Sequence, residues 1–240
     1  MGTLILLRHG RSTSNVAGTL AGRSEGVGLD DTGRAQAYAV AARLQPVPLA
    51  AVVTSPLQRC RETLAPLLAA RSVEATVEDR FSEVDYGEWT GRGLKDLGKE
   101  PLWRVVQAHP SAAVFPAGEG LAGMQARAVA AVREWDAKLT AESGPRAVWL
   151  ACSHGDVIKA VLADALGVHL DGFQRIVVDP GSISVVTYTE TRPFVARVND
   201  TGGDVSGLVP PPPTPKRRRK KDTAQALSSD APVGGSTGTA

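Results

Sequence analysis

The sequence has no long apolar run and only two cysteines. No apolar segment of its 240 residues approaches the roughly 20 residues that span a bilayer, so we expect no transmembrane helix. The first residues also lack the pattern of a secretory signal peptide, because the apolar run Leu4–Leu7 is far too short. Cys60 and Cys152 have no metal-binding or redox spacing, which predicts reduced, buried thiols in a cytoplasmic protein.

The sequence also lacks a large net charge of either sign. The formal net charge is +2, but six of the 27 Lys and Arg residues and three of the 25 Asp and Glu residues lie beyond residue 200. The first 200 residues therefore carry a net charge of −1, which argues against nucleic acid as a partner of this part of the chain. No P-loop is present, so binding of a nucleoside triphosphate by that motif is not indicated.

The composition divides the chain near residue 200. Beyond it come Gly202-Gly203, Pro210–Pro213 and the basic run Lys216–Lys221, with too little apolar surface to offset the entropy of ordering. We predict one globular domain over residues 1–200 and a disordered, proline-rich and basic tail over residues 201–240. The basic run could contact nucleic acid or anionic lipid, but a solubilising tail is the simpler interpretation.

Apolar runs alternate with helical patterns along the domain. Buried strands are expected at Leu4–Leu7, Leu49–Thr54 and Ala147–Ala151, and further strands at Val73–Val77, Ile176–Val178, Ser182–Thr189 and Arg192–Val198. The patterns predict helices over Arg34–Leu44, Pro56–Ala70, Ala117–Glu142 and Asp156–Leu166. Residues 11–28 favour a loop, and residues 92–116 favour a short cap whose helix is interrupted by Gly98 and Pro101. The alternation indicates an α/β fold with a parallel sheet.

Three of the predicted strands end in groups suited to a phosphate. Arg8-His9 ends the first, Ser55 and then Arg59 follow the second, and His154 follows the third. The carboxyl ends of parallel strands meet at one edge of a sheet, so we expect these groups to converge. Two arginines and two histidines around one point are costly unless an anion binds there, and a phosphoryl group is the obvious candidate.

Each of these residues also has a structural explanation. Arg59 would serve equally well as a solvated surface residue, and a lone histidine is more often structural than catalytic. Glu83, Asp85 and Glu88 lie among aromatic residues, where desolvation raises a carboxyl pKa toward that of a useful general acid. The alternative is an ordinary loop packed by Trp89.

Four motifs together resemble the histidine phosphatase superfamily, in its phosphoglycerate mutase-like branch. They are Arg8-His9-Gly10-x-Ser12-Thr13-x-Asn15, Ser55-Pro56-x-x-Arg59-x-Arg61-x-Thr63, Phe81-x-Glu83-x-x-x-Gly87-x-Trp89-x-Gly91 and Ser153-His154-Gly155. The resemblance covers about residues 2–200 in the family's order and spacing. It implies a three-layer α/β/α sandwich with a mainly parallel central sheet.

The resemblance also implies a mechanism. His9 would attack phosphorus and form a phosphohistidine, while one of its ring nitrogens bonds to the Gly10 carbonyl. Arg8, Arg59 and His154 would bind the phosphoryl oxygens, and Glu83 would act as general acid and base. Asn15 and Arg23 resemble further positions that bind the substrate phosphate. No metal ion or cofactor is expected, and the partner is a small-molecule phosphomonoester.

Departures from the family pattern separate its branches. Cofactor-dependent phosphoglycerate mutases usually carry Glu after Arg-His-Gly, where this chain has Arg11, and they have a later Arg-Arg pair that is missing before the tail. The short cap and the Gly87-x-Trp89 pattern are more similar to the phosphatase branch. We therefore predict a phosphomonoester hydrolase, with a phosphomutase and a non-catalytic phospho-ligand-binding relative as alternatives. The sequence leaves the choice between monomer and homodimer open.

Overall fold

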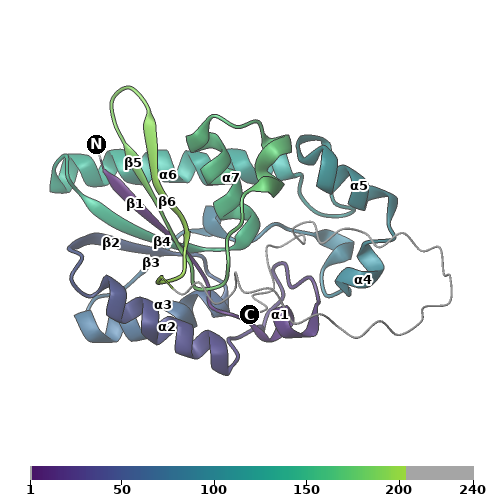
Figure 1. Ribbon diagram of the computed structural model, residues 1–240, viewed down its shortest axis with the longest axis horizontal. Coiled ribbons are helices and arrows are strands. Elements are labelled where there is room, and N and C mark those ends of the chain that lie inside the picture. Colours follow the sequence, from purple (N-terminus) through teal and green to yellow (C-terminus); the bar gives the residue numbers. More distant parts are fainter. Residues whose placement is uncertain (1, 204–240) are drawn as a thin grey trace.

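The fold is built around one six-stranded sheet. The computed structural model describes residues 2–203, and most of the predicted tail lies outside them. The strand order is β3-β2-β4-β1-β5-β6 (Figure 1). The strands are β1 (Thr3–Arg8), β2 (Leu49–Thr54), β3 (Thr76–Val77), β4 (Val148–Ser153), β5 (Ile183–Tyr188) and β6 (Pro193–Asp200). The pairs β3–β2, β2–β4 and β4–β1 are parallel, whereas β5 is antiparallel to both β1 and β6. The sheet is therefore mainly parallel, as predicted.

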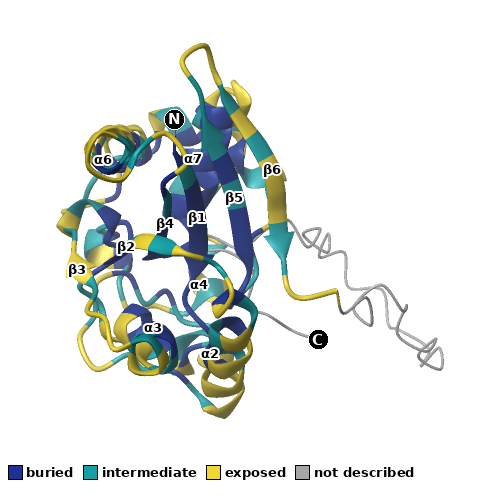
Figure 2. Cartoon of the chain, turned by 90° about the vertical axis from the view of Figure 1, so that its left-hand side faces the viewer, coloured by how far each residue is buried: buried dark blue, intermediate teal, exposed yellow. Residues whose placement is uncertain are grey.

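Helices cover both faces of this sheet. The pair α2 (Asp31–Leu44) and α3 (Gln58–Arg71) lies on one face, and the pair α6 (Leu121–Ser143) and α7 (Gly155–Leu166) lies on the other (Figure 2). Alternation along β1 explains the two layers of core. Leu4 and Leu6 pack on the α6–α7 side, while Ile5 and Leu7 pack on the α2–α3 side. The predicted α/β/α sandwich is confirmed.

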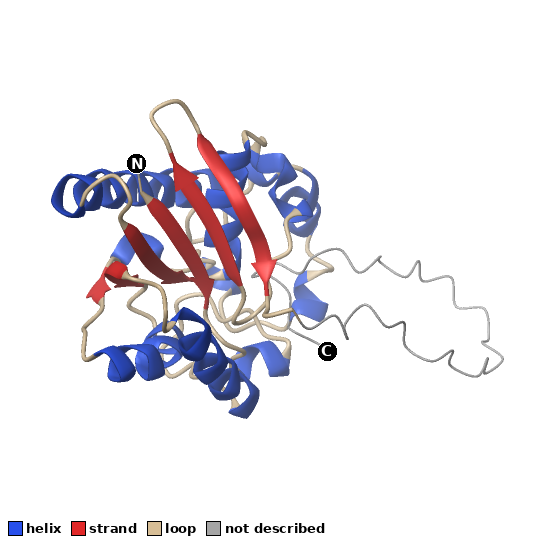
Figure 3. Ribbon diagram, turned by 60° about the vertical axis from the view of Figure 1, so that its left-hand side comes forward, coloured by secondary structure: helices blue, strands red, loops and turns tan. Residues whose placement is uncertain are grey.

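Three parallel strands bring their carboxyl ends to the same edge of the sheet (Figure 3). Register pairs Arg8 at the end of β1 with Ser153 at the end of β4, and Thr54 at the end of β2 with Cys152. The residues that follow these strands are thereby placed side by side. Open α/β sheets bind their ligands outside the carboxyl ends of the strands, which is where these residues lie.

The segment predicted to form a cap is built from short helices. Residues 92–116 contain α4 (Leu94–Leu97), α5 (Pro101–Ala108) and the 3-10 helix η3 (Pro110–Ala112). Gly98 ends α4, and Pro101 begins α5, where its missing N–H costs nothing. The cap meets the loop after β1 through an isolated bridge between Thr19 and Gly93. That loop holds a helix that the sequence analysis missed, α1 (Thr13–Ala17), closed by a capping box between Ser12 and Asn15.

Several predicted boundaries were wrong. The third helix begins at Gln58 rather than Pro56, and Ser55 contacts the Leu57 amide and His154 Nε2 ahead of the helix instead of capping it. The long helix begins at Leu121, since Ala117 has a left-handed φ of 52°. No strand forms at Ile176–Val178, which follows the 3-10 helix η4 (Leu170–Arg175) as a loop. The other 3-10 helices are η1 (Asp79–Phe81) and η2 (Gly87–Trp89). No helix in residues 2–203 is long and apolar enough to cross a membrane.

Candidate active site

His9 lies at the end of β1, buried and held in one orientation. Its Nδ1 lies 2.7 Å from the Gly10 carbonyl oxygen, so this nitrogen carries the proton and donates. The expected hydrogen bond is therefore present, and it leaves a lone pair on Nε2. Burial, and then the charges of Arg59 and Arg8, hold the pKa of His9 well below its ordinary value. His9 is consequently a neutral imidazole whose Nε2 carries no proton.

Gly10 is required here because the chain passes very close to α2. A Cβ on Gly10 would lie 2.6 Å from the Gly33 carbonyl oxygen, which belongs to the rigid backbone of that helix. The Gly10 amide donates to Thr63 Oγ1 at 2.9 Å, and Thr63 in turn donates to the Arg59 carbonyl. The end of β1 is thus fixed against both α2 and α3.

Two buried arginines flank His9. Arg59, in the first turn of α3, places Nε 3.3 Å from His9 Nε2 and donates from Nη2 to the Gly22 carbonyl at 2.8 Å. Its Nη1 is buried and has no hydrogen-bond partner within residues 2–203. Arg8 donates from Nη1 to the Val178 carbonyl at 2.7 Å, and burial lowers its pKa to about 10. The Arg8 guanidinium therefore still carries its charge at neutral pH.

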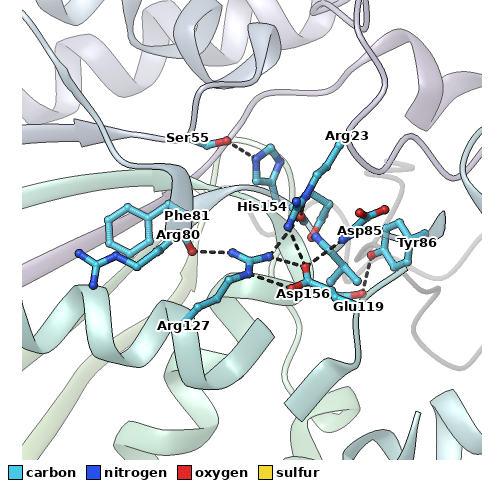
Figure 4. A network of polar contacts seen from close by, with 12 residues as sticks. Arg23, Ser55, Arg80, Phe81, Asp85, Tyr86, Glu119, Arg127, His154 and Asp156 are labelled. Carbon is cyan, nitrogen blue, oxygen red and sulfur yellow. Dashed lines mark hydrogen bonds and ion pairs between the residues drawn. The ribbon is translucent and has the colours of Figure 1, made fainter. Parts of the chain in front are cut away.

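The second histidine completes the positive end of the site. His154 precedes α7, and its ring centroid lies 5.2 Å from that of His9. Its Nε2 lies 2.7 Å from Ser55 Oγ (Figure 4), whereas its buried Nδ1 has no partner in the described part of the chain. Burial and the charge of Arg59 lower the pKa of His154, so this ring is also neutral. Unpartnered buried nitrogens on Arg59 and His154 are suited to the oxygens of an anion.

Glu83 supplies a carboxyl group whose proton can be exchanged near neutral pH. It is 4% exposed, and its Oε1 accepts a hydrogen bond from the Val84 amide at 3.0 Å. Burial raises its pKa to about 7, and the negative charge of Asp156 adds to this effect, while Arg59 and Arg8 oppose it. The expectation of a desolvated carboxyl among aromatic residues is confirmed at this position.

Asn15 and Arg23 have partners within the protein. Asn15 Oδ1 accepts from the amide and the hydroxyl of Ser12 at 2.9 Å in the α1 capping box. Arg23 donates from Nε to the Glu83 carbonyl at 2.9 Å and from Nη2 to Glu119 at 3.0 Å. Arg23 is thereby linked directly to the loop that carries Glu83. Their predicted contact with a phosphate stays a prediction.

Arg127 and Glu119 also hold the Glu83 loop, and the sequence analysis did not single them out. Arg127 on α6 donates to the Arg80 carbonyl, to the Glu83 carbonyl at 3.3 Å and to Glu119 (Figure 4). Glu119 in turn accepts from the Asp85 amide at 2.9 Å. The sequence offered little indication of this role, because a glutamate before a long helix and an arginine within it are common.

Other residues near the site take positions that their motifs did not predict. Arg11, which stands where the related mutases carry Glu, forms a 2.7 Å ion pair with Asp30 at the start of α2. Cys60 and Cys152 are free and buried, and Cys60 Sγ lies 3.5 Å from His154 Nε2. No group of three or more His, Cys, Asp or Glu side chains within residues 2–203 is arranged to hold a metal ion.

The site thus brings together a neutral histidine, two arginines, a second histidine and a protonatable carboxyl. A family model described as the histidine phosphatase superfamily (branch 1) matches residues 4–201. The chain belongs to this superfamily. Five of its residues, named from the sequence alone, meet around one point: Arg8, His9, Arg59, Glu83 and His154. A phosphoryl-transfer function of the histidine phosphatase type follows from the family.

Members with different names resemble this chain to a similar degree. Phosphoserine phosphatase 1 of Hydrogenobacter thermophilus is 29% identical over 206 residues, which is 82% of this chain and 92% of the relative. A protein of Erwinia tasmaniensis named "Probable phosphoglycerate mutase GpmB" is 30% identical over 208 residues, covering 85% and 93%. The solved structure of Bacillus stearothermophilus YhfR superposes with a TM-score of 0.76 at 25% identity, covering 83% of this chain and 98% of that one.

Proposed function

We propose that the protein is a phosphomonoester hydrolase that acts through a phosphohistidine at His9, with Glu83 as general acid and base. The observation that carries this proposal is the pairing of protonation states. His9 is neutral with no proton on Nε2, while a pKa of about 7 leaves a substantial fraction of Glu83 protonated near neutral pH. A nucleophile and a proton donor with these properties are what a two-step phosphoryl transfer needs.

The first step makes the phosphoenzyme. His9 Nε2 forms a bond to phosphorus as the bond from phosphorus to the ester oxygen breaks, and Glu83 gives its proton to the departing oxygen. In the second step, a water oxygen bonds to phosphorus as the bond to Nε2 breaks, and the water's proton passes to Glu83. Glu83 ends each cycle protonated, so no external acid is consumed.

Arg8, Arg59 and His154 stabilise the charge that moves during both steps. The buried Nη1 of Arg59 and Nδ1 of His154 have no protein partner within residues 2–203, which suits them to the non-bridging oxygens. Arg59 contacts His9 Nε2, so its guanidinium lies next to the nitrogen to which the phosphoryl group would be attached. Because two guanidinium groups supply the positive charge, the proposed mechanism uses no metal ion or cofactor. Asn15 and Arg23 are proposed as further phosphate ligands.

A phosphomutase is the second candidate, since a relative named as a phosphoglycerate mutase is as similar as one named as a phosphatase. The two activities share the phosphohistidine and differ in whether water or a second alcohol accepts the phosphoryl group. A small-molecule phosphomonoester is the proposed partner in either case. A cytoplasmic location and the choice between monomer and homodimer stay predictions.

The deciding experiment compares wild type, His9→Ala and His169→Ala. His169 lies on the surface beside η4 and is the matched control. Phosphate release is measured on a panel of phosphomonoesters, with 3-phosphoglycerate plus a trace of bisphosphoglycerate alongside. We expect acid-labile phosphoenzyme and phosphate release in wild type and His169→Ala, and neither in His9→Ala. Interconversion of phosphoglycerates with little phosphate release would identify a mutase, and the absence of any phosphoenzyme would indicate a non-catalytic relative.

A further inference from the structure

A second polar layer lies behind the catalytic groups, and the mechanism above does not use it. Asp156 is fully buried in the first turn of α7, two residues after His154. Its Oδ2 accepts a hydrogen bond from the Tyr86 hydroxyl at 2.8 Å (Figure 4), and its Oδ1 lies 3.3 Å from Lys159 Nζ. Tyr86 is buried as well, so a carboxylate, a phenol and an ammonium group meet without solvent.

Lys159 extends this layer toward the cap. Its side chain is 1% exposed, and its Nζ lies 4.6 Å from the centre of the Phe173 ring. The same Nζ donates to Gln174 Oε1, and Gln174 Nε2 donates to the Val106 carbonyl in α5 at 3.4 Å. A continuous set of polar contacts therefore joins the cap, η4 and α7 to the loop that carries Glu83.

The energetics of this layer point to a role other than stability. Removing two charges from water costs several kcal/mol per ion, and a buried pair returns that cost only when its geometry is very good. Here the ion pair is long, at 3.3 Å, and it occupies a helix whose other side chains are almost all apolar and buried. An apolar pair of similar volume would pack at least as well, so the charges themselves are the feature to explain.

The position of Tyr86 connects the layer to the acid. Tyr86 follows Glu83 by three residues, so its bond to Asp156 ties the acid loop to α7, the helix that follows His154. Arg23 and Arg127 hold the same loop from the other side through the Glu83 carbonyl. The Glu83 carboxyl thus has both the arginines of the phosphate site and the Asp156 carboxylate of the second layer among its charged neighbours.

We propose that Asp156 is a positioning residue for Glu83: held by Tyr86 and Lys159, it keeps the acid protonated and aimed at the leaving group. This inference rests on the proposed function, because it assigns Glu83 the proton transfer. The charged groups that interact with Glu83 are Arg8 from β1, Arg59 from α3, and Asp156 and Lys159 from α7. The arginines favour loss of the proton and Asp156 favours its retention, so Asp156 offsets the charge that phosphate binding requires.

The test separates proton donation from general damage. Asp156→Asn is compared with wild type on glycerol 2-phosphate, whose leaving group needs a proton, and on p-nitrophenyl phosphate, whose leaving group does not. We expect the high-pH limb of kcat for glycerol 2-phosphate to move down by about one pH unit when the charge is lost. At pH 7.5, activity on glycerol 2-phosphate should fall by roughly tenfold relative to activity on p-nitrophenyl phosphate. A merely structural role would lower both activities together and leave the limb in place.

Further variants keep the result interpretable. Asp164→Asn removes one negative charge from a partly exposed position of the same helix, and it should move neither the limb nor the ratio. Asp156→Asn leaves Lys159 without its carboxylate, and Lys159 also interacts with Glu83. The double variant Asp156→Asn/Lys159→Met is therefore compared with Lys159→Met, in which the lysine charge is already absent. The limb is expected to lie lower in the double variant than in Lys159→Met. Equal limbs in these two variants would overturn the proposal, because the effect of Asp156→Asn would then belong to the stranded lysine.

A titration without substrate separates failure of this inference from failure of the proposed function. Glu83 is followed by carboxyl ¹³C NMR in glutamate-labelled protein, with its resonance assigned through Glu83→Gln. We expect its midpoint to lie about one pH unit lower in Asp156→Asn than in wild type, whatever the enzyme hydrolyses. Equal midpoints would refute the role of Asp156. A lower midpoint in an inactive protein would refute the proposed function and leave the electrostatic coupling standing.

Discussion

Replacing Glu83 by Gln should make the protein more stable, and increasingly so as the pH rises. Burial raises the folded-state pKa of Glu83 to about 7, whereas in the unfolded chain it has its ordinary value of 4.5. Below pH 4.5 the carboxyl is protonated in both states and costs nothing. Between the two values the unfolded chain loses its proton first, which favours unfolding. Above pH 7 the folded protein contains a buried charge, and the full cost is present.

The magnitude follows from the two pKa values. A folded-state pKa raised from 4.5 to about 7 corresponds to about 3 kcal/mol of lost stability at high pH, at 1.36 kcal/mol per unit. Part of the loss is already present at pH 5, so the linkage relation gives a difference of about 2.5 kcal/mol between pH 5 and pH 8. Gln has nearly the same shape and cannot ionise, so it removes this dependence and retains the packing.

The assay is urea unfolding of wild type and Glu83→Gln at pH 5 and at pH 8. We expect the gain in unfolding free energy from Gln to be about 2.5 kcal/mol larger at pH 8. The buried histidines also titrate, but they are present in both proteins and largely cancel in the difference. Glu78→Gln is a control for which we expect the opposite dependence of stability on pH. The Arg80 side chain lowers the pKa of Glu78 to about 2, so Gln should destabilise at neutral pH and lose that effect as the pH falls. An equal Glu83→Gln effect at both pH values would refute the reasoning.

Two further substitutions test the role of Arg59 and the close packing of the backbone at Gly10. Arg59→Lys should lower kcat/KM by roughly a hundredfold, because a single ammonium group cannot contact His9, the Gly22 carbonyl and a phosphate oxygen together. Arg61→Lys, exposed on the same helix, should change it little. Gly10→Ala should lower the unfolding free energy by about 2 kcal/mol or more, because its Cβ would meet the Gly33 carbonyl. Gly123→Ala, in open space within α6, should instead stabilise by about 0.5–1 kcal/mol, and equal effects would refute the clash argument.

The convergence of the arginines and histidines of the site was predictable because it depends on strand direction alone. The runs before Arg8, Arg59 and His154 are apolar over four to six residues, and parallel strands must end at the same edge. Fixing the ends of β1, β2 and β4 therefore fixes which side chains meet. Exact pairing was not needed, and an error of one or two residues at a helix start did not move the site.

The misplaced strand at Ile176–Val178 shows where an apolar run misleads. The position beside β1 is taken by β5, so this segment has no strand to pair with. The Val178 carbonyl instead accepts the hydrogen bond from Arg8 Nη1. Sequence periodicity cannot separate a strand from an apolar loop whose backbone serves as a ligand for a side chain far away in the chain.

The layer behind Glu83 was missed for a different reason. Asp156 and Lys159 are three residues apart on a helix, a spacing that normally means an exposed ion pair. A clue was available in the residues around them, since Val157, Ile158 and Ala160–Ala163 make the helix apolar on every side. A helix of that kind is buried all round, so charges within it have to be buried too. Their partner Tyr86 comes from another part of the chain, and no local pattern predicts it.

Burial is the common cause of both protonation states on which the proposed chemistry depends. It disfavours the charged form of any group, so it lowers the pKa of His9 and raises that of Glu83. Burial therefore leaves His9 without a proton on its nucleophilic nitrogen and favours the protonated form of Glu83. The arginines assist the first effect and oppose the second, and the charge on Asp156 adds to the effect of burial on Glu83. The folded-state pKa of Glu83 therefore determines two measurable properties. It sets the loss of protein stability at high pH, and it sets the proposed capacity of Glu83 to donate a proton near neutral pH.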